Sequence, residues 1–193
     1  MRASLKYIRI KKAITVLKTG GIIAYPTEGV YGLGCDPFDP ATVHRLLQIK
    51  QRNIYKGLIL IAADWESIKK LVKDNIPIEK LKVAQASWPG PYTWIFPASD
   101  VVPPWIKGQF DTVALRITAH PIAHALCKAF EGPIVSTSAN ISAHSSLKLL
   151  EDVRKEFINK VDFILPGRVG DLNGPTLIRD VLTGETIRKV PYE

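Results

Sequence analysis

Short apolar runs and segments of helical periodicity alternate irregularly along this chain, and this pattern constrains the fold more than any other feature. Apolar residues recur at helical spacing from Ile10 to Leu17 and stop before Gly20-Gly21, a pair suited to ending a helix. The apolar run at 22–25 follows and predicts a buried strand. Some strand candidates follow one another without an intervening helix, which favours an α/β fold with a mixed sheet over a strictly parallel sheet.

The other elements are predicted from helix caps and apolar runs. Asp39 and Pro40 are suited to the N-cap and first position of a helix that ends near Lys50, and Asp64 is suited to capping a further helix. More helices are expected at 121–130 and at about 149–158. Further strands are expected at 58–62, 93–96, 112–117, 133–136, 162–165, 176–179 and 186–190. The proline-containing segment 99–108 is expected to be an extended connection.

The size, charge and cysteine usage narrow the class of protein. A chain of 193 residues predicts one domain, so residues 1–193 are expected to form a single domain. Its formal charge of +8 favours anionic partners such as nucleotides, RNA or acidic proteins. No apolar run approaches the roughly 18 residues of a membrane span, so a cytoplasmic protein without membrane contact is expected. Cys35 and Cys127 are expected to be reduced thiols in or near the core.

Polar or glycine-rich stretches directly adjoin several of the apolar runs. Ligands of α/β proteins bind where strands end and loops begin, so repeated polar strand exits indicate a substrate crevice. The stretch YPTEGVYGLG is the most pronounced of them, and it is expected to be a glycine-rich loop shaped around a ligand or a plain turn. The segments are 25–34, 50–52, 88–93, 136–140 and 170–176.

Two of these segments and one charged residue within an apolar strand carry candidate binding groups. Lys50 and Arg52 would point the same way in an extended chain and form a phosphate clamp, although solvated charges at a helix end give the same pattern. The stretch STSAN at 136–140 offers hydroxyls and an amide that suit a phosphate or ribose, or a Ser/Thr-rich turn. Arg116 in an apolar strand needs an anionic partner, either a protein carboxylate such as Asp111 or Glu28 or a substrate carboxylate.

Common motifs are absent from the sequence. It contains no GxxxxGK[ST] phosphate loop, no GxGxxG, no HExxH and no GxSxG. His120 and His124 have the spacing of one helical turn, but they are interpreted as a helix start rather than a metal site.

Taken in order, the segments resemble the YrdC-type threonylcarbamoyl-AMP synthases, in their short, single-domain bacterial form. The resemblance rests on YPTEGVYGLGCDP, LLQIKQR, KGLILIAA, WPGPYTWIFPA, FDTVALRIT, PIVSTSAN and LIRDVLTGE, which together span residues 22–188. It implies a twisted open mixed sheet flanked by helices, with a basic concave surface. It also implies a nucleotidyltransferase that joins L-threonine, bicarbonate and ATP into threonylcarbamoyl-AMP and releases pyrophosphate.

The resemblance also implies roles for individual residues. Lys50 and Arg52 would be the catalytic pair, and Mg²⁺ is expected on the phosphates although no dedicated carboxylate cluster for it is visible. The implied ATP contacts are Lys50, Arg52, Thr112, Ser138, Asn140 and Arg188. The implied threonine contacts are Thr27, Arg116, Ser136 and Thr176. Glu28 would orient Thr27 or Arg116, or would contact the substrate amine.

The resemblance further implies partners: the product would feed a separate transferase complex that modifies an adenosine of tRNA, and direct contact with tRNA is possible. Two other functions remain open from the sequence. The same basic surface could belong to an RNA-binding module without turnover. A related carbamoyl-adenylate activity occurs in hydrogenase-maturation proteins with a similar domain, but those are long chains with cysteine-rich zinc modules, for which this chain has no room.

Overall fold

The computed structural model describes residues 2–141 and 145–189, with side chains from residue 7 onward. Among the described residues, nine strands form one sheet in the order β7-β1-β2-β6-β3-β5-β4-β8-β9. The sheet contains both parallel pairs (β1 with β7, β3 with β5, β4 with β8) and antiparallel ones, so the predicted mixed α/β sheet is confirmed. The strands are β1 (Ile23–Pro26), β2 (Tyr31–Gly34), β3 (Ile59–Ala62), β4 (Tyr92–Pro97), β5 (Thr112–Ile117), β6 (Ile134–Ser138), β7 (Phe163–Ile164), β8 (Leu177–Asp180) and β9 (Thr186–Arg188).

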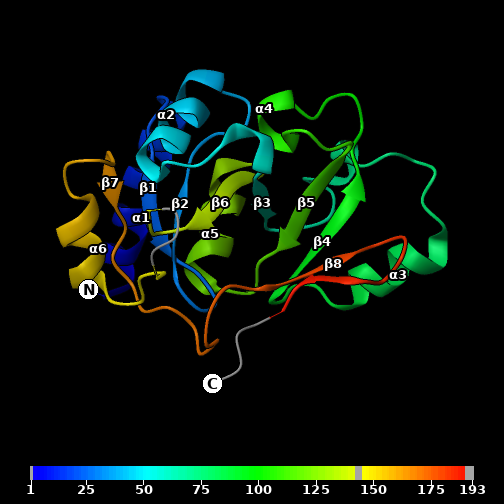
Figure 1. Ribbon diagram of the computed structural model, residues 1–193. Helices are drawn as coiled ribbons and strands as arrows, with labels where there is room; N and C mark the ends of the chain where they lie inside the picture. The colour runs from blue at the N-terminus through cyan, green and yellow to red at the C-terminus, as the bar shows by residue number, and fades with distance from the viewer. Residues whose placement is uncertain (1, 142–144, 190–193) are drawn as a thin grey trace.

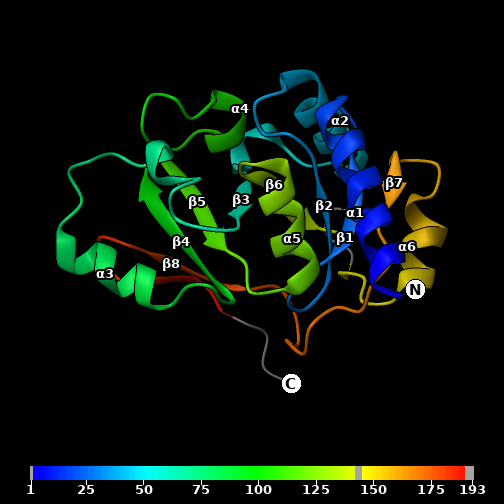
Figure 2. The same ribbon diagram turned by 180° about the vertical axis from the view of Figure 1, so that it is seen from behind.

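Helices flank this open sheet. Figures 1 and 2 show α1 and α5 against the same face of the sheet, while α2 and α4 lie next to each other along the upper edge in Figure 1. No helix in the described part of the chain combines the length and apolar character needed to cross a membrane. The helices are α1 (Arg2–Lys18), α2 (Pro40–Lys50), α3 (Ile78–Ala86), α4 (Pro104–Lys107), α5 (Pro121–Phe130) and α6 (Leu150–Phe157), with 3₁₀ turns η1 (Ile54–Lys56) and η2 (Lys69–Leu71).

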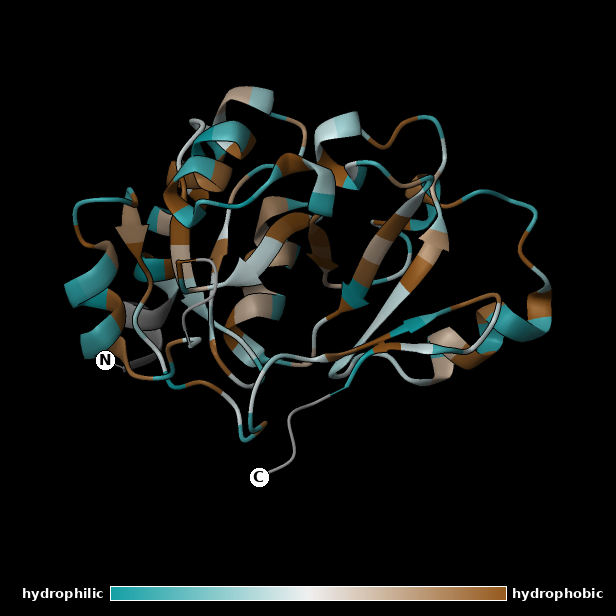
Figure 3. Cartoon of the chain, in the orientation of Figure 1, coloured by the Kyte–Doolittle hydropathy of each residue, from teal (hydrophilic) through white to brown (hydrophobic). Residues whose placement is uncertain are grey.

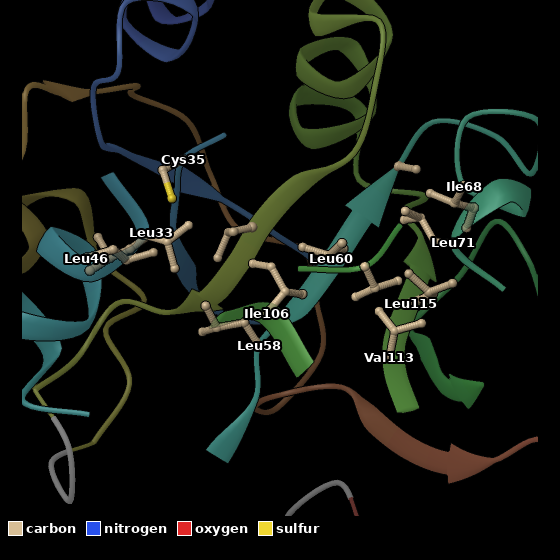
Figure 4. Packing of buried hydrophobic residues seen from close by; sticks show 14 of the residues in the cluster. Leu33, Cys35, Leu46, Leu58, Leu60, Ile68, Leu71, Ile106, Val113 and Leu115 are labelled. Atoms are coloured by element: carbon tan, nitrogen blue, oxygen red, sulfur yellow. The ribbon is translucent and has the colours of Figure 1, made fainter. Parts of the chain in front are cut away.

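The core has two parts because successive strand residues point to opposite faces of the sheet. Leu60 packs with α2 and α4 in the larger part, which Figure 4 shows, and its neighbour Ile61 packs under α1 and α5 in the smaller part. Both cysteines are buried free thiols, as expected, and burial raises the pKa of each thiol. Figure 3 shows β3, β4 and β5 brown over part of their length, whereas α6 is mostly teal and the tip of β5 turns teal.

The glycine-rich loop predicted after β1 is wrong in its second half, which forms β2. This strand lies between β1 and β6 and has every residue buried. A Cβ on Gly34 would lie 2.5 Å from the Val135 carbonyl oxygen and 2.8 Å from the Tyr25 ring. The glycines therefore allow a strand to fit closely against an aromatic ring, which sequence propensity interprets as a loop.

The helix predicted after Asp64 is also wrong. Asp64 does accept hydrogen bonds from the Ser67 backbone and hydroxyl, at 2.9 and 2.7 Å, but only the 3₁₀ turn η2 follows. The chain then becomes extended because Val72 bridges to Ala98 and the Lys73 amide donates to the Pro97 carbonyl. Tertiary pairing thus overrides the helical periodicity.

Three smaller differences concern two short helices and the end of the last strand. The connection predicted at 99–108 contains the short helix α4, which is followed by Gly108 as its C-cap with φ 66°. Helix α3 was not predicted, because its sequence lacks a clear apolar stripe and Ile78 and Val83 are exposed. The last predicted strand included Val190, which lies outside the described residues.

The helix start predicted at the His120/His124 pair is confirmed. His120 is the N-cap of α5, and its ring accepts a hydrogen bond from the Ala123 amide.

Candidate functional site

Four of the five polar segments, all but 88–93, contribute residues to one cavity, here called the arginine cavity. The turn after β1, the end of β6, the tip of β5 and the segment entering β8 supply its walls, and the orange segment between β7 and β8 passes below the sheet in Figure 1. The structure thus brings together most of the predicted site residues. Those that line the cavity are Thr27, Arg52, Arg116, Ser136, Ser138, Thr176 and Arg188.

Three arginines give this cavity its positive charge. Burial lowers the pKa of Arg52, and burial together with Arg116 and Arg52 lowers the pKa of Arg188 to about 10. Even at that value a guanidinium stays charged at neutral pH. Like charges are held close together in a partly buried space, so the arginine cavity is suited to binding anions.

The Arg116 side chain is buried and held by two neighbouring residues. Its Nη1 donates to the Thr176 hydroxyl at 2.9 Å, and its Nη2 lies 3.2 Å from Glu28 Oε2. Of the two protein carboxylates considered as partners, Glu28 is therefore the one that pairs with Arg116. Burial raises the pKa of the Glu28 carboxyl, but Arg116, the Thr118 hydroxyl, the backbone of Glu28 and His120 outweigh burial and hold that pKa below its usual value.

Thr176 connects two of the arginines. Its hydroxyl accepts from Arg116, and its carbonyl oxygen accepts from Arg188 Nε and Nη2 at 3.0 and 2.7 Å. The Thr176 hydroxyl also lies 3.0 Å from the hydroxyl of Thr93, which is fully buried. The entry into β8 thereby fixes the positions of both guanidinium groups relative to each other.

Lys50 and Arg52 do not form the extended clamp predicted from their spacing. Gln51 between them has a left-handed backbone with φ 50° and ends α2, so the chain is not extended at this point. Lys50 Nζ donates to the Ser138 carbonyl at 2.5 Å and to the Asn140 carbonyl at 2.8 Å, and Arg52 donates to the Gly57 carbonyl at 3.0 Å. Burial, and then Arg52, lower the pKa of Lys50 to about 8.

The STSAN stretch is ordered by its own polar groups. The Ser138 hydroxyl donates to Asn140 Oδ1 at 2.7 Å, and Lys50 Nζ lies 3.0 Å from the same oxygen. Ser136 is buried in β6 opposite Ile59. Thr27 also lines this cavity, and its hydroxyl donates to the Val30 carbonyl at 2.7 Å and closes the turn after β1.

Thr112 lines a second, adjoining cavity, here called the Thr112 cavity. It is larger, about 410 Å³ against about 90 Å³ for the arginine cavity. The two cavities share Arg52 and Arg188 on their walls. The walls of the Thr112 cavity are mostly apolar and include Ile178 and Ile187. A ligand whose anionic group binds the shared arginines could therefore place an apolar group in the Thr112 cavity.

The turn after β1 also meets the segment that enters β8. A Cβ on Gly29 would lie 2.2 Å from the Gly174 carbonyl oxygen, so only glycine permits this approach. The Gly170 amide donates to the Thr27 carbonyl at 2.9 Å, and the Leu172 amide donates to the Glu28 carbonyl at 3.0 Å. These contacts close one side of the arginine cavity.

Two residues of this network were not singled out from the sequence: Thr93 and Thr118. Both are threonines with a fully buried side chain in or next to an apolar strand. A buried hydroxyl requires a hydrogen-bond partner, so a threonine at the end of an apolar strand is the signal that identifies them. No group of three or more His, Cys, Asp or Glu side chains suited to a metal ion occurs within residues 7–141 and 145–189.

Comparison with known proteins gives a consistent result. The family model of the Sua5, YciO and YrdC proteins, described as telomere recombination, matches residues 15–189. A protein of Coxiella burnetii named threonylcarbamoyl-AMP synthase is 49% identical over 181 residues, which cover 93% of this chain and 96% of that protein. A protein of Halorhodospira halophila with the same name is 48% identical over 181 residues, 94% of each chain.

Solved structures also resemble this chain. The P. abyssi Sua5 structure complexed with L-threonine is 37% identical with a TM-score of 0.83, and the match covers 89% of this chain and 50% of that one. This chain therefore spans about half the length of that protein. E. coli YciO is 26% identical with a TM-score of 0.79 over 94% of this chain and 90% of that one.

Proposed function

We propose that this chain, which belongs to the Sua5, YciO and YrdC family, joins L-threonine, bicarbonate and ATP into threonylcarbamoyl-AMP and releases pyrophosphate. The observation that carries the proposal is the arginine cavity with its adjoining larger cavity. Relatives named threonylcarbamoyl-AMP synthase, matched along nearly their whole length, support it. They support a role in tRNA modification and do not favour an RNA-binding module without turnover.

The reaction places several negative charges in one space. The threonine amine takes up the carbon of bicarbonate with loss of water, and an oxygen of the resulting carbamate attacks the α-phosphorus of ATP. The bond from that phosphorus to the bridging oxygen breaks, and pyrophosphate leaves with its electrons. The carboxylate, carbamate and phosphates are all anions, so positioning and charge stabilisation by arginines are the contributions needed from the protein.

The threonine side of the site is proposed to consist of Thr27, Arg116, Ser136 and Thr176. Arg116 would bind the carboxylate, since a guanidinium matches a carboxylate in shape and charge. Thr27 and Ser136 both line the arginine cavity and would contact the rest of the amino acid. Support comes from their position in one cavity and from the L-threonine complex of P. abyssi Sua5, a relative with the same fold.

The nucleotide side is proposed to consist of Lys50, Arg52, Thr112, Ser138, Asn140 and Arg188. Arg52 and Arg188 stand between the two cavities and would bind phosphates, while the apolar walls of the Thr112 cavity would bind the base or ribose. Lys50 would act with Arg52 as the catalytic pair and also holds the backbone at Ser138 and Asn140. Mg²⁺ would accompany the phosphates, which can supply much of its coordination.

Further parts of the proposal concern the setting of the enzyme. The labile product would pass to a transferase complex that modifies an adenosine of tRNA, and the +8 formal charge is compatible with direct contact with tRNA. We also propose that residues 1–193 act as one domain and that the protein works in the cytoplasm.

The experiment is a pyrophosphate assay on the full chain with Mg-ATP, bicarbonate and L-threonine. Pyrophosphate is expected only when all three substrates are present, and carbamoyl phosphate in place of threonine and bicarbonate should release none. Salt-sensitive RNA binding without any pyrophosphate would instead support the RNA-binding module and contradict the enzyme.

A further inference from the structure

Glu28 occupies the wall behind the arginine cavity. Arg116 lines that cavity, whereas Glu28 lines a separate open depression together with His120, Pro91 and Leu172. Both side chains of the Glu28–Arg116 pair are nearly inaccessible, at 9% and 5% exposure. The carboxylate is therefore in contact with the guanidinium but not with the space where we place the substrate.

Each oxygen of Glu28 contacts a different neighbour. Oε1 accepts a hydrogen bond from the Thr118 hydroxyl at 2.6 Å, whereas Oε2 forms an ion pair with Arg116 Nη2 at 3.2 Å and accepts no hydrogen bond within the described residues. The Thr118 hydroxyl in turn accepts from the His120 amide at 3.2 Å, at the start of α5. A chain of contacts thus runs from the start of α5 through Thr118 and Glu28 to the guanidinium.

The remaining donors of Arg116 define what this arrangement leaves for a ligand. Nη1 is used by Thr176 and Nη2 faces Glu28, but Nε is buried without a hydrogen-bond partner within the described part of the chain. An unsatisfied buried donor is costly unless some partner completes it. In the proposed complex, a substrate carboxylate at the Arg116 guanidinium would bring acceptor oxygens to this group.

Glu28 is poorly suited to act as the base that takes a proton from the threonine ammonium. Its pKa is held below the usual value for a glutamate, since Arg116, Thr118, its own backbone and His120 outweigh the effect of burial. An efficient base has a pKa closer to the operating pH. Arg116 lines the arginine cavity and Glu28 does not, and the Glu28 carboxylate forms its ion pair with Arg116.

We propose that Glu28 is a positioning residue that fixes Arg116 for the substrate carboxylate, with Thr118 holding Glu28 in place. The inference rests on the proposed function, because the carboxylate belongs to threonine there. It also answers the choice left open by the sequence: Glu28 orients Arg116 rather than contacting the substrate amine.

The test compares Glu28→Gln, which keeps the size of the side chain and removes its charge, with Glu79→Gln. Glu79 also forms an ion pair, with Lys82, but on the surface with 79% exposure. In the pyrophosphate assay, Glu28→Gln is expected to raise the KM for threonine by roughly 10-fold or more, with kcat and the KM for ATP within about 3-fold of wild type. Glu79→Gln should leave all three unchanged.

A second variant keeps the test decisive if Glu28→Gln fails to fold. Thr118→Val preserves both charges and removes only the hydrogen bond to Oε1, so a smaller rise in the KM for threonine is expected. Melting temperatures are measured for every variant. An unchanged KM for threonine in folded Glu28→Gln or Thr118→Val would overturn the positioning role.

A fall in kcat without a change in the KM for threonine would also overturn it, because Glu28 would then act in the chemical step. Failure of the proposed function has a different signature: wild-type protein would release no threonine-dependent pyrophosphate in the same assay. In that case the inference falls together with the function. The positioning role alone is wrong if the wild-type protein is active but Glu28→Gln does not raise the KM for threonine more than the KM for ATP.

Discussion

Replacing Arg52 with alanine is expected to remove most synthesis of threonylcarbamoyl-AMP. Arg52 stands on the shared wall of the arginine cavity and the Thr112 cavity, where we place the ATP phosphates. Its Nη2 donates to the Gly57 carbonyl at 3.0 Å, which holds the guanidinium in place on that wall. Loss of a charge-assisted contact that strengthens in the transition state should lower kcat/KM for ATP roughly 100-fold, or about 3 kcal/mol.

The measurement is steady-state pyrophosphate release at varied ATP. Lys69→Ala is the matched control, since it removes a surface cation that pairs with Glu66 and lies on neither cavity. The control should keep wild-type kinetics. Near-normal kcat/KM for ATP in Arg52→Ala would rule out Arg52 as a phosphate ligand.

Replacing Arg116 with methionine is expected to damage both stability and threonine use. The substitution leaves the buried Glu28 carboxylate without its counter-charge, and breaking a buried pair in this way costs about 3–5 kcal/mol of unfolding free energy. The double variant Arg116→Met with Glu28→Gln removes both charges, so it should recover most of that free energy. Its use of threonine should remain poor, because the group that binds the carboxylate is still missing.

Denaturant unfolding and kinetics on the same samples separate these two effects. The single variant is expected to be unstable with a high threonine requirement, and the double variant stable with a high threonine requirement. A double variant that regains a normal KM for threonine would show that Arg116 supports the fold and does not bind the substrate.

The order of strands and helices was largely predictable because most elements have a clear apolar pattern. The failures have physical causes. The sequence of β2 predicts a loop because its glycines have low strand propensity. In the fold, the same glycines make room for the Tyr25 ring and the Val135 carbonyl. The helix after Asp64 is replaced by pairing of Val72 with Ala98, a contact between distant segments. Local sequence signals do not contain such pairings.

The sequence predicts which residues belong to the site better than it predicts the contacts between them. Resemblance to a family identified the residues that line the arginine cavity, and their position together in the fold agrees with that choice. The contacts between them were not predictable, because they join residues far apart in the sequence, as Glu28 and Arg116 or Thr93 and Thr176 do. The spacing of Lys50 and Arg52 predicts an extended clamp, and this prediction is wrong because Gln51 between them has a left-handed backbone.

A crystal structure of the chain with L-threonine and a non-hydrolysable ATP analogue tests the central claim most directly. The account predicts the threonine carboxylate within hydrogen-bonding distance of Arg116, with Glu28 still paired to that guanidinium. It places the phosphates at Arg52 and Arg188 and the nucleoside in the Thr112 cavity. Threonine or ATP bound away from these two adjoining cavities would contradict the account.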